Sequence, residues 1–293
     1  MMENALTVKK LAAVSDLIRL TKQYGTLLCL WPALWSLFIA SKGLPQARLL
    51  VIFVLGAFLM RSAGCAVNDI ADRGFDSKVE RTMSRPLADG RLKVKEALFV
   101  FLSLSAFAFV LVLFLNRLTI MLSFVGLSLA CLYPFVKRVS RLPQAFLGIA
   151  FGWGAVMAWA AVTGTIGAAG VLIFAANIFW SMAYDTIYAL MDKEDDIKAG
   201  VKSTAILFGA HVYKALYALY FAFALTLGAA GVVSGLGPMY YAGVFLSLVF
   251  LLSITGWLEK KPTRQRAFNA FVANAALGAV IFVSIVLDAR LRF

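Results

Sequence analysis

Long apolar stretches recur along the whole length of this chain, and they constrain its fold more than any other feature. A stretch of about 18 or more apolar residues crosses roughly 30 Å of hydrocarbon as a helix. Because lipid offers no partner for backbone N–H and C=O groups, only helices and closed barrels span a bilayer. Charged residues make up 15% of the chain, against about 25% in a soluble domain. The sequence therefore predicts an all-α integral membrane protein.

Nine transmembrane helices are predicted, and we expect them to form one bundle in a single domain that covers residues 1–293. The spans are 24–41, 49–67, 97–115, 118–136, 143–163, 167–190, 211–233, 238–257 and 268–288. The first of them is too long and too poorly flanked to be a cleaved signal peptide.

The positive charges are distributed unevenly between the two sides of this predicted bundle. The N-terminal segment and alternate connections hold 22 of the 28 Lys and Arg, while the other connections and the C-terminus hold five. This asymmetry predicts a cytoplasmic N-terminus and, with nine spans, an outside C-terminus. We expect a multi-pass protein of the cell inner (cytoplasmic) membrane. Topology and contact with membrane lipid explain the net charge of +13 better than a nucleic-acid partner does.

Acidic residues gather in two clusters at the ends of predicted spans. Carboxylates beside membrane segments are costly, so they indicate a functional site. Nine of the 15 acids lie in or near the clusters: Asp69, Asp72, Asp76, Glu80, Asp185, Asp192, Glu194, Asp195 and Asp196. By the predicted topology, both clusters face the cytoplasm.

The spacing of the acids is typical of paired ligands on helix faces. Asp72 and Asp76 are four residues apart, as are Asp192 and Asp196, so each pair can face one way. The two pairs are offset by 120 residues, which indicates a weak parallel repeat. Pairs facing each other would form an oxygen-rich site for Mg²⁺. The candidate metal ligands are Asn68, Asp69, Asp72, Asp76, Asp192 and Asp196.

Local sequence predicts how each cluster is carried. Gly74 weakens a helix, so we expect the first cluster at a helix end that emerges into a polar loop over about 68–95. The second motif loop is expected over about 185–205, with Asp185, Asp192 and Asp196 on one helix face. The candidate catalytic residues are Asp72, Asp76, Asp185, Asp192 and Asp196. Solvated helix ends are the structural alternative. For Asp185, binding metal, accepting a phenol proton and a hydrogen bond to a neighbouring helix all remain open.

Basic residues close to these acids can neutralise a diphosphate. Arginine forks suit phosphate oxygens. The candidate substrate-binding residues are Arg61, Arg73, Arg81, Arg85, Arg138 and Lys202. For most of them the alternative is topology or lipid headgroup contact. Arg61 lies about 10 Å below Asn68 on roughly the same face, where it can meet a substrate carboxylate, Asp185 or a neighbouring helix.

At these residues the chain resembles the UbiA family of intramembrane aromatic prenyltransferases. The matching segments are Asn68-Asp69-x-x-Asp72-x-x-x-Asp76, Arg81-Thr82-x-x-Arg85-Pro86-Leu87, Tyr184-Asp185-Thr186-x-Tyr188-Ala189, Asp192-x-x-Asp195-Asp196, Lys202-Ser203-Thr204-Ala205, Leu30-Trp31-Pro32-x-Leu34-Trp35 and Leu132-Tyr133-Pro134-Phe135. The details are most like the 4-hydroxybenzoate polyprenyltransferases of ubiquinone biosynthesis.

The resemblance implies an enzyme that uses Mg²⁺ and a polyprenyl diphosphate to prenylate 4-hydroxybenzoate at the ring carbon ortho to its hydroxyl. The members of that subgroup often have Lys-Pro-Ile-Gly entering the first span, where this chain has Lys22-Gln23-Tyr24-Gly25. A sister enzyme with another aromatic or quinone-precursor acceptor, as in the futalosine pathway of menaquinone, is therefore the first alternative.

Two other functional classes suit parts of the pattern. A secondary transporter also carries intramembrane charge and repeats, but here the acids lie at one membrane face and the repeat is parallel. A lipid-phosphate binder without turnover is the other class.

Overall fold

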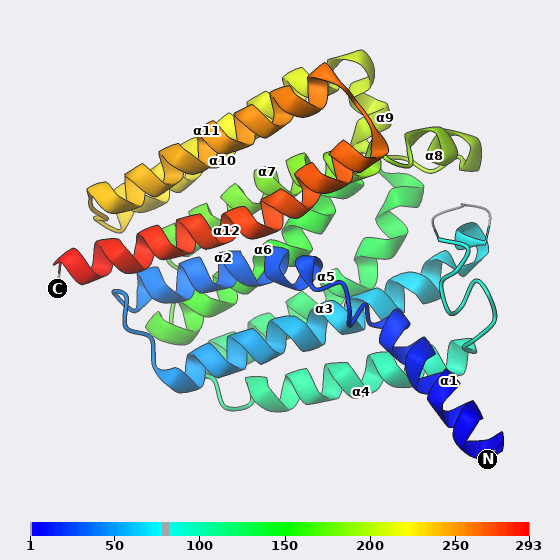
Figure 1. Cartoon of the computed structure of the whole chain (residues 1–293). Coiled ribbons are helices and arrows are strands. Elements are labelled where there is room, and N and C mark those ends of the chain that lie inside the picture. Colours follow the sequence, from blue (N-terminus) through cyan, green and yellow to red (C-terminus); the bar gives the residue numbers. More distant parts are fainter. Residues whose placement is uncertain (1, 78–81, 293) are drawn as a thin grey trace.

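The computed structural model describes residues 2–77 and 82–292, and every regular element in them is a helix (Figure 1). The elements are α1 (Met2–Leu17), α2 (Tyr24–Ala40), α3 (Ala47–Asp76), α4 (Val94–Val112), α5 (Arg117–Val139), α6 (Pro143–Thr163), α7 (Ala168–Ala189), α8 (Lys193–Ala199), α9 (Thr204–Phe208), the 3₁₀ turn η1 (Gly209–His211), α10 (Val212–Val233), α11 (Pro238–Lys260) and α12 (Arg264–Arg292).

Each of the nine predicted spans coincides with one long helix. Within the described ranges, eight helices are long and apolar enough to cross a membrane. The remaining predicted span is α2, an apolar helix of only 17 residues. The all-helical membrane fold is therefore confirmed, whereas the count of nine spans and the orientation of the termini stay predictions.

The helix boundaries follow from local chemistry. Pro143 and Pro238 stand at the first helical position of α6 and α11, where the missing N–H costs nothing. The Asn116 side chain accepts a hydrogen bond from the Thr119 backbone N–H at 3.0 Å and caps α5. Gly164 ends α6 with φ +72°, a conformation that suits glycine.

The first acidic cluster lies at the end of a helix, as expected, but α3 continues through Gly74 to Asp76, so the loop begins after residue 76 rather than near residue 68. The expectation of a single helix face in the second acidic segment was wrong. The helix α7 ends at Ala189 and α8 begins at Lys193, which breaks the single face expected for Asp185, Asp192 and Asp196. Ion pairs on the last turns of α3 offset the roughly 1 kcal/mol that a mid-helix glycine costs. A turn whose Met191 N–H donates to Tyr188 O, instead of four residues back, ends α7.

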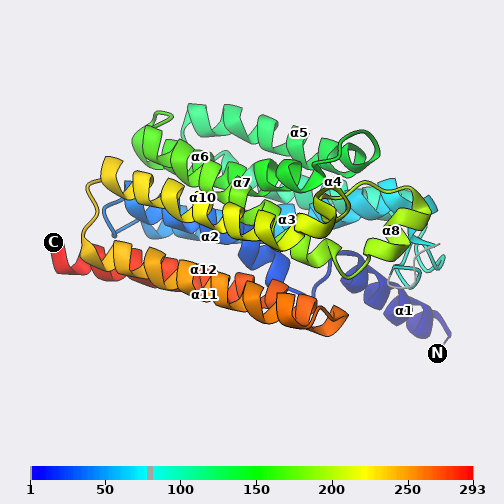
Figure 2. The same cartoon turned by 90° about the horizontal axis from the view of Figure 1, so that it is seen from above.

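Figure 2 shows α11 and α12 along one side of the molecule and α5 along the opposite side. Six helices pack against one another in a closed ring: α2, α6, α7, α10, α11 and α12. Its core contains a continuous aromatic stack in which Trp180 lies 5.3 Å from Trp35 and 5.6 Å from Phe223. Asn274 accepts hydrogen bonds from Trp180 at 2.9 Å and Tyr220 at 3.2 Å. These partners satisfy a buried amide oxygen in an apolar interior.

The helices α3, α4 and α5 pack beside α2 and α6 of this ring, and we call these five helices the hollow half because they line a large cavity. Figure 1 places α1, α8 and the C-terminal end of α3 at one end of the molecule, opposite the C-terminus. Both acidic motifs therefore lie at the same end, as their shared sidedness in the sequence predicted.

Candidate functional site

A cavity of about 1150 Å³ fills the hollow half and reaches its acidic end. Charged side chains line one part of it: Asp16, Arg19, Lys22, Arg61, Asp69, Arg85, Arg91 and Asp185. Apolar side chains line the rest, among them Leu102, Phe109, Leu115, Phe124, Trp153 and Met157. The cavity is thus amphipathic along its length, with a polar mouth and an apolar interior, which suits a ligand with a charged head and a hydrocarbon tail.

The carboxylates of the first motif are buried at the end of α3. Asp69 is 0% exposed and Asp72 1% exposed. Arg19 donates to both oxygens of Asp69, at 2.7 and 3.1 Å, and Arg85 lies 3.2 Å from the same carboxylate. Buried charges persist only when they are paired and hydrogen-bonded. These two arginines are therefore the partners of the buried Asp69 carboxylate, and they hold its geometry.

The next two carboxylates of the motif have basic partners from other elements. Lys137 of α5 forms an ion pair with Asp72, and Arg85 pairs with Asp76 at 2.8 Å. The Thr82 hydroxyl donates to the Asp76 backbone oxygen at 3.0 Å. Arg85 thus bridges Asp69 and Asp76 and ties the loop after α3 to the motif.

Arg91 is a further basic residue at the mouth of the cavity. The Arg91 side chain lies 2.6 Å from both Asp16 of α1 and Asp89. Hydrogen bonds to Asp16 and Asp89 raise the pKa of Arg91 further above its usual range, so it stays charged at any physiological pH. This contact holds α1 against the loop that carries Arg85.

Three of the predicted substrate-binding residues donate hydrogen bonds to backbone carbonyl groups in this structure. Arg73 is exposed and donates to Ile70 O at 2.7 Å. Arg138 donates to Ala71 O at 2.6 Å and lies over the rings of Phe75 and Phe135. Lys202 donates to Val139 O at 3.0 Å. Their roles toward substrate stay predictions, and Arg81 lies outside the described residues.

The second motif is divided between a helix and the turn after it. Asp185 lies on α7 and lines the cavity. Asp192 precedes α8 and is 8% exposed, while Asp196 is half-buried on α8. Asp69, Asn68 and Asp185 line the cavity. The carboxylates of Asp72, Asp76, Asp192 and Asp196 lie outside its described lining.

The donor atoms of the two motifs fit a hard cation in chemistry, although they are not gathered around one point. In the parts of the chain that are described, no three His, Cys, Asp or Glu side chains converge on a metal position. Asp72 nevertheless keeps one buried oxygen, Oδ1, without a hydrogen-bond partner. An unpaired buried carboxylate oxygen is costly, and an all-oxygen donor set suits Mg²⁺. Basic side chains pair with the other carboxylates of the first motif.

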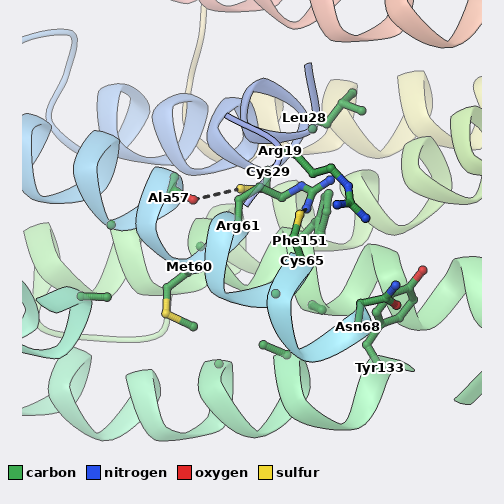
Figure 3. A pocket seen from close by; sticks show the side chains of 18 of the residues that line it. Arg19, Leu28, Cys29, Ala57, Met60, Arg61, Cys65, Asn68, Tyr133 and Phe151 are labelled. Atoms are coloured by element: carbon green, nitrogen blue, oxygen red, sulfur yellow. Dashed lines mark hydrogen bonds between the residues drawn. The ribbon is translucent and has the colours of Figure 1, made fainter. Parts of the chain in front are cut away.

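Arg61 is a half-buried cation in the wall of the cavity (Figure 3). Its guanidinium donates to Cys65 Sγ and lies 5.8 Å above the Phe151 ring. Its Nε is buried without a partner, and it forms no ion pair with any described carboxylate. A Cβ at Gly25 would come within 2.6 Å of Nε, so a larger residue there would force the Arg61 guanidinium to move. An uncompensated cation with a buried nitrogen marks a site for an anionic group.

Sequence reasoning overlooked Arg19 as a partner of Asp69. Arg19 adopts φ +56°, which is uncommon for a residue with a Cβ. This conformation ends α1 and turns the side chain toward α3. No hydropathy or spacing signal distinguishes it from the neighbouring cations. The sequence contained a weak indication for Lys137, because this residue follows the predicted span 118–136 on the side of the membrane where the acidic clusters lie.

Comparisons with known proteins point to one family. The sequence profile of the UbiA prenyltransferase family matches residues 29–277. The chain is 46% identical to a 4-hydroxybenzoate octaprenyltransferase of Alkalilimnicola ehrlichii, over 94% of each chain. It is 48% identical to the protein of that name in Ectopseudomonas mendocina, over 94% of this chain and 93% of the relative.

Solved structures share the fold. The apo structure of a UbiA homolog from Aeropyrum pernix K1 superposes with a TM-score of 0.77 at 27% identity, covering 90% of this chain and 97% of that one. A UbiA homolog from Archaeoglobus fulgidus, bound to GPP and Mg²⁺, has a TM-score of 0.72 at 16% identity, with 94% and 99% covered. The second likeness concerns the fold alone.

Proposed function

The chain belongs to the UbiA prenyltransferase family, and from that membership we propose that it transfers a polyprenyl group to 4-hydroxybenzoate. The donor is a polyprenyl diphosphate, the new bond forms at the ring carbon ortho to the hydroxyl, and the product serves ubiquinone biosynthesis. Relatives that cover almost the whole chain carry the name 4-hydroxybenzoate octaprenyltransferase, which supports this acceptor.

The Arg61 guanidinium is the single observation that carries the choice of acceptor. It lines the cavity, it has no carboxylate partner in the described residues, and its Nε is unsatisfied. A benzoate carboxylate would give this cation a partner through two parallel hydrogen bonds. The Phe151 ring beside Arg61 offers an apolar surface for an aromatic ring.

The cationic side chains at the mouth suit the diphosphate head of the donor. Arg19, Arg85 and Arg91 line the cavity there, and Lys137 stands beside Asp72. Guanidinium groups donate in a fixed fork that matches phosphate oxygens. The three arginines each have a carboxylate partner, so they are held in place before the substrate arrives.

We propose that Mg²⁺ is held by Asp72, Asp76, Asp192 and Asp196, with Asn68 and Asp69 as further oxygen donors. Bound there, the ion would neutralise charge on the departing diphosphate. The unpartnered Oδ1 of Asp72 and the all-oxygen donor set support this assignment. Because the helix breaks at Leu190–Asp192, the carboxylates of Asp192 and Asp196 can be positioned independently of α7.

The chain's own residues would then handle the organic chemistry. The allylic carbon–oxygen bond breaks, a carbon–carbon bond forms at the ring, and the ring loses one proton. Arg61 orients the acceptor by its carboxylate end, and Asp185, which lines the same cavity, lies within the chamber to take a proton directly or through a water. Tyr133, Phe151 and Leu28 line the chamber between them and keep water from the allylic centre.

The active site is proposed to face the cytoplasm from the inner membrane. The end of the bundle that carries both acidic motifs also carries most of the Lys and Arg residues, as expected for a cytoplasmic side.

Detergent-purified protein with geranyl diphosphate and 4-hydroxybenzoate tests the proposal directly. We expect a C-prenylated hydroxybenzoate by mass spectrometry with Mg²⁺ and none with EDTA. Arg61→Met is expected to raise the KM for 4-hydroxybenzoate by roughly tenfold or more, since one charge-assisted contact contributes about 1.5–3 kcal/mol, while the KM for the diphosphate changes little. Absence of product from folded protein would overturn the assignment.

A second acceptor is favoured by one observation. Gln23 and Tyr24 replace the commoner Pro and Ile of the subgroup, and Tyr24 lines the cavity beside Gly25, which lies against Arg61. The departure in sequence thus lies at the acceptor chamber. Turnover with another aromatic acid but none with 4-hydroxybenzoate would move the chain to a sister enzyme.

A further inference from the structure

We propose that Gln144, Thr186 and Thr204 are positioning residues for the second acidic motif, and we call these three residues the anchor. They hold the end of α7 against the start of α9, and so fix both ends of residues 190–203, the segment that carries the two metal-binding carboxylates of that motif. This inference rests on the proposed function, because it concerns residues assigned there to Mg²⁺.

The hydroxyl groups of Thr186 and Thr204 form the centre of the anchor. Thr186 lies on the last turn of α7, one residue after Asp185, and Thr204 is the first residue of α9. Both threonines are fully buried, and their hydroxyls are hydrogen-bonded to each other. The Thr186 hydroxyl donates its only proton to Met182 O, so it accepts the proton of Thr204. The two helices that flank the segment are therefore joined at its base.

Two further contacts attach the same end of the segment to α5 and α6. Gln144 is buried in the first turn of α6, and its side-chain oxygen accepts a hydrogen bond from the Thr204 backbone N–H at 3.0 Å. Lys202 donates to Val139 O at the end of α5. Because a buried N–H without a partner is costly, Gln144 determines where α9 can begin. Contacts from three helices thus hold this end of the segment.

Backbone hydrogen bonds connect the anchor to the acidic residues. The Val201 N–H donates to Asp196 O at 2.9 Å, and the Asp196 N–H donates to Asp192 O at 2.8 Å. Gly200 ends α8 with φ +70°, a conformation that glycine adopts without strain, and it turns the chain back toward Thr204. A displacement of Thr204 therefore reaches both acidic residues along a short, hydrogen-bonded path.

The anchor lowers the entropy that the segment must lose when the metal binds. Holding the ends of a loop together costs conformational entropy, and here buried hydrogen bonds offset that cost during folding. Without them, Mg²⁺ would have to order the segment itself, so a higher Mg²⁺ concentration would be needed. None of the three anchor residues belongs to the described lining of the cavity. We therefore expect them to affect metal binding and to leave the chemical step unchanged.

Thr204→Val tests the anchor, because valine keeps the shape of the side chain and the backbone N–H while it removes the hydroxyl. The Mg²⁺ concentration for half-maximal turnover is expected to rise about threefold to tenfold, the size of losing one hydrogen bond. The kcat at saturating Mg²⁺ is expected to stay within about twofold of wild type. Thr204→Ser restores the hydroxyl and should return the wild-type Mg²⁺ dependence.

Thr255→Val is the matched control. Thr255 is also a fully buried threonine, but it donates to Leu251 O within α11 and belongs to neither motif, so its Mg²⁺ dependence should equal that of wild type. Gln144→Met removes the other anchor contact and should give the same shift as Thr204→Val, which keeps the test open if the valine variant does not fold. A wild-type Mg²⁺ dependence in the folded anchor variants, or an equal shift in Thr255→Val, would overturn the proposal.

Hydrogen–deuterium exchange of the Mg²⁺-free protein, followed by mass spectrometry, tests the anchor without turnover. Amides of residues 190–203 should exchange about threefold or more faster in Thr204→Val than in wild type, while residues 68–77 keep their wild-type rates. Unchanged exchange in residues 190–203, or faster exchange in both segments alike, contradicts a positioning role. If wild type forms no product, the proposed function has failed, and the exchange rates still decide whether the anchor holds the segment.

Discussion

The two acidic motifs carry similar residues on different supports. The first lies on one continuous helix, α3, and its carboxylates are buried and paired with Arg19, Arg85 and Lys137. The second is divided by the break between α7 and the seven-residue α8. A motif on a long packed helix has fixed geometry, while a motif on a short helix after a turn can shift by a small change in the turn. We infer that the first motif provides the rigid reference and the second adjusts to the bound head group.

The largest expected effect tests whether the two motifs act together. Asp72→Asn and Asp196→Asn should each lower kcat by about 10² to 10³, the size of losing one preorganised electrostatic contact. Product formation at saturating Mg²⁺, followed by mass spectrometry, measures it. Full activity in Asp196→Asn would show that the second motif takes no part, and the comparison would then fail.

Stability should distinguish the motifs more sharply than activity does. Asp69→Asn leaves the Arg19 guanidinium, which is 20% exposed, without its carboxylate. Breaking a buried ion pair costs about 3–5 kcal/mol, and partial exposure reduces this to roughly 2–3 kcal/mol. Thermal unfolding in detergent should show a clear drop for Asp69→Asn and a small one for Asp192→Asn. Equal drops would contradict the assignment of the rigid role.

The ion pair between Lys137 and Asp72 is a feature of the first motif that one substitution can remove. Lys137→Met removes the ammonium beside Asp72 and leaves its carboxylate more available to a cation. We expect Mg²⁺, titrated calorimetrically with a non-hydrolysable prenyl diphosphate, to bind roughly threefold to tenfold more tightly, since one nearby charge changes binding by about 1 kcal/mol. Lys214→Met is the control, because Lys214 is an exposed cation on α10 and belongs to neither motif. Weaker binding in Lys137→Met would show that the lysine helps to hold the ligand.

The smallest effect is expected at the outer edge of the second motif. Arg264 lies 3.6 Å from Asp195, and its side chain is 61% exposed. Exposed ion pairs contribute about 0–1 kcal/mol. Arg264→Gln should therefore shift the unfolding midpoint by no more than a degree or two and leave kcat unchanged. A large loss of activity would place this edge in the working site.

The sequence predicted the helices well because lipid leaves the backbone few alternatives, and each apolar stretch became a helix near its expected bounds. The four-residue spacing of Asp72 and Asp76 also survived, since α3 stays helical to Asp76. The helix break before α8 could not be predicted from spacing. The seven-residue interval from Asp185 to Asp192 places both side chains on one face of an unbroken helix, and the interval carries no sign of the break. The pairing of Asp69 with Arg19 depends on a backbone turn with φ +56° at an arginine, which no residue preference signals.

The hydrogen bonds from Trp31 and Trp35 to α12 have a consequence for how the protein is made. Trp31 bonds a residue 244 positions later in the chain. At a translation rate of about 5–20 residues per second, the first span waits roughly 12 to 50 seconds in the bilayer before its partner is synthesised. During that time α2 lacks the helix α12 on which it packs. The helix α12 therefore closes this side of the bundle, and a nascent chain cut short before residue 264 would lack the carbonyl groups to which Trp31 and Trp35 donate.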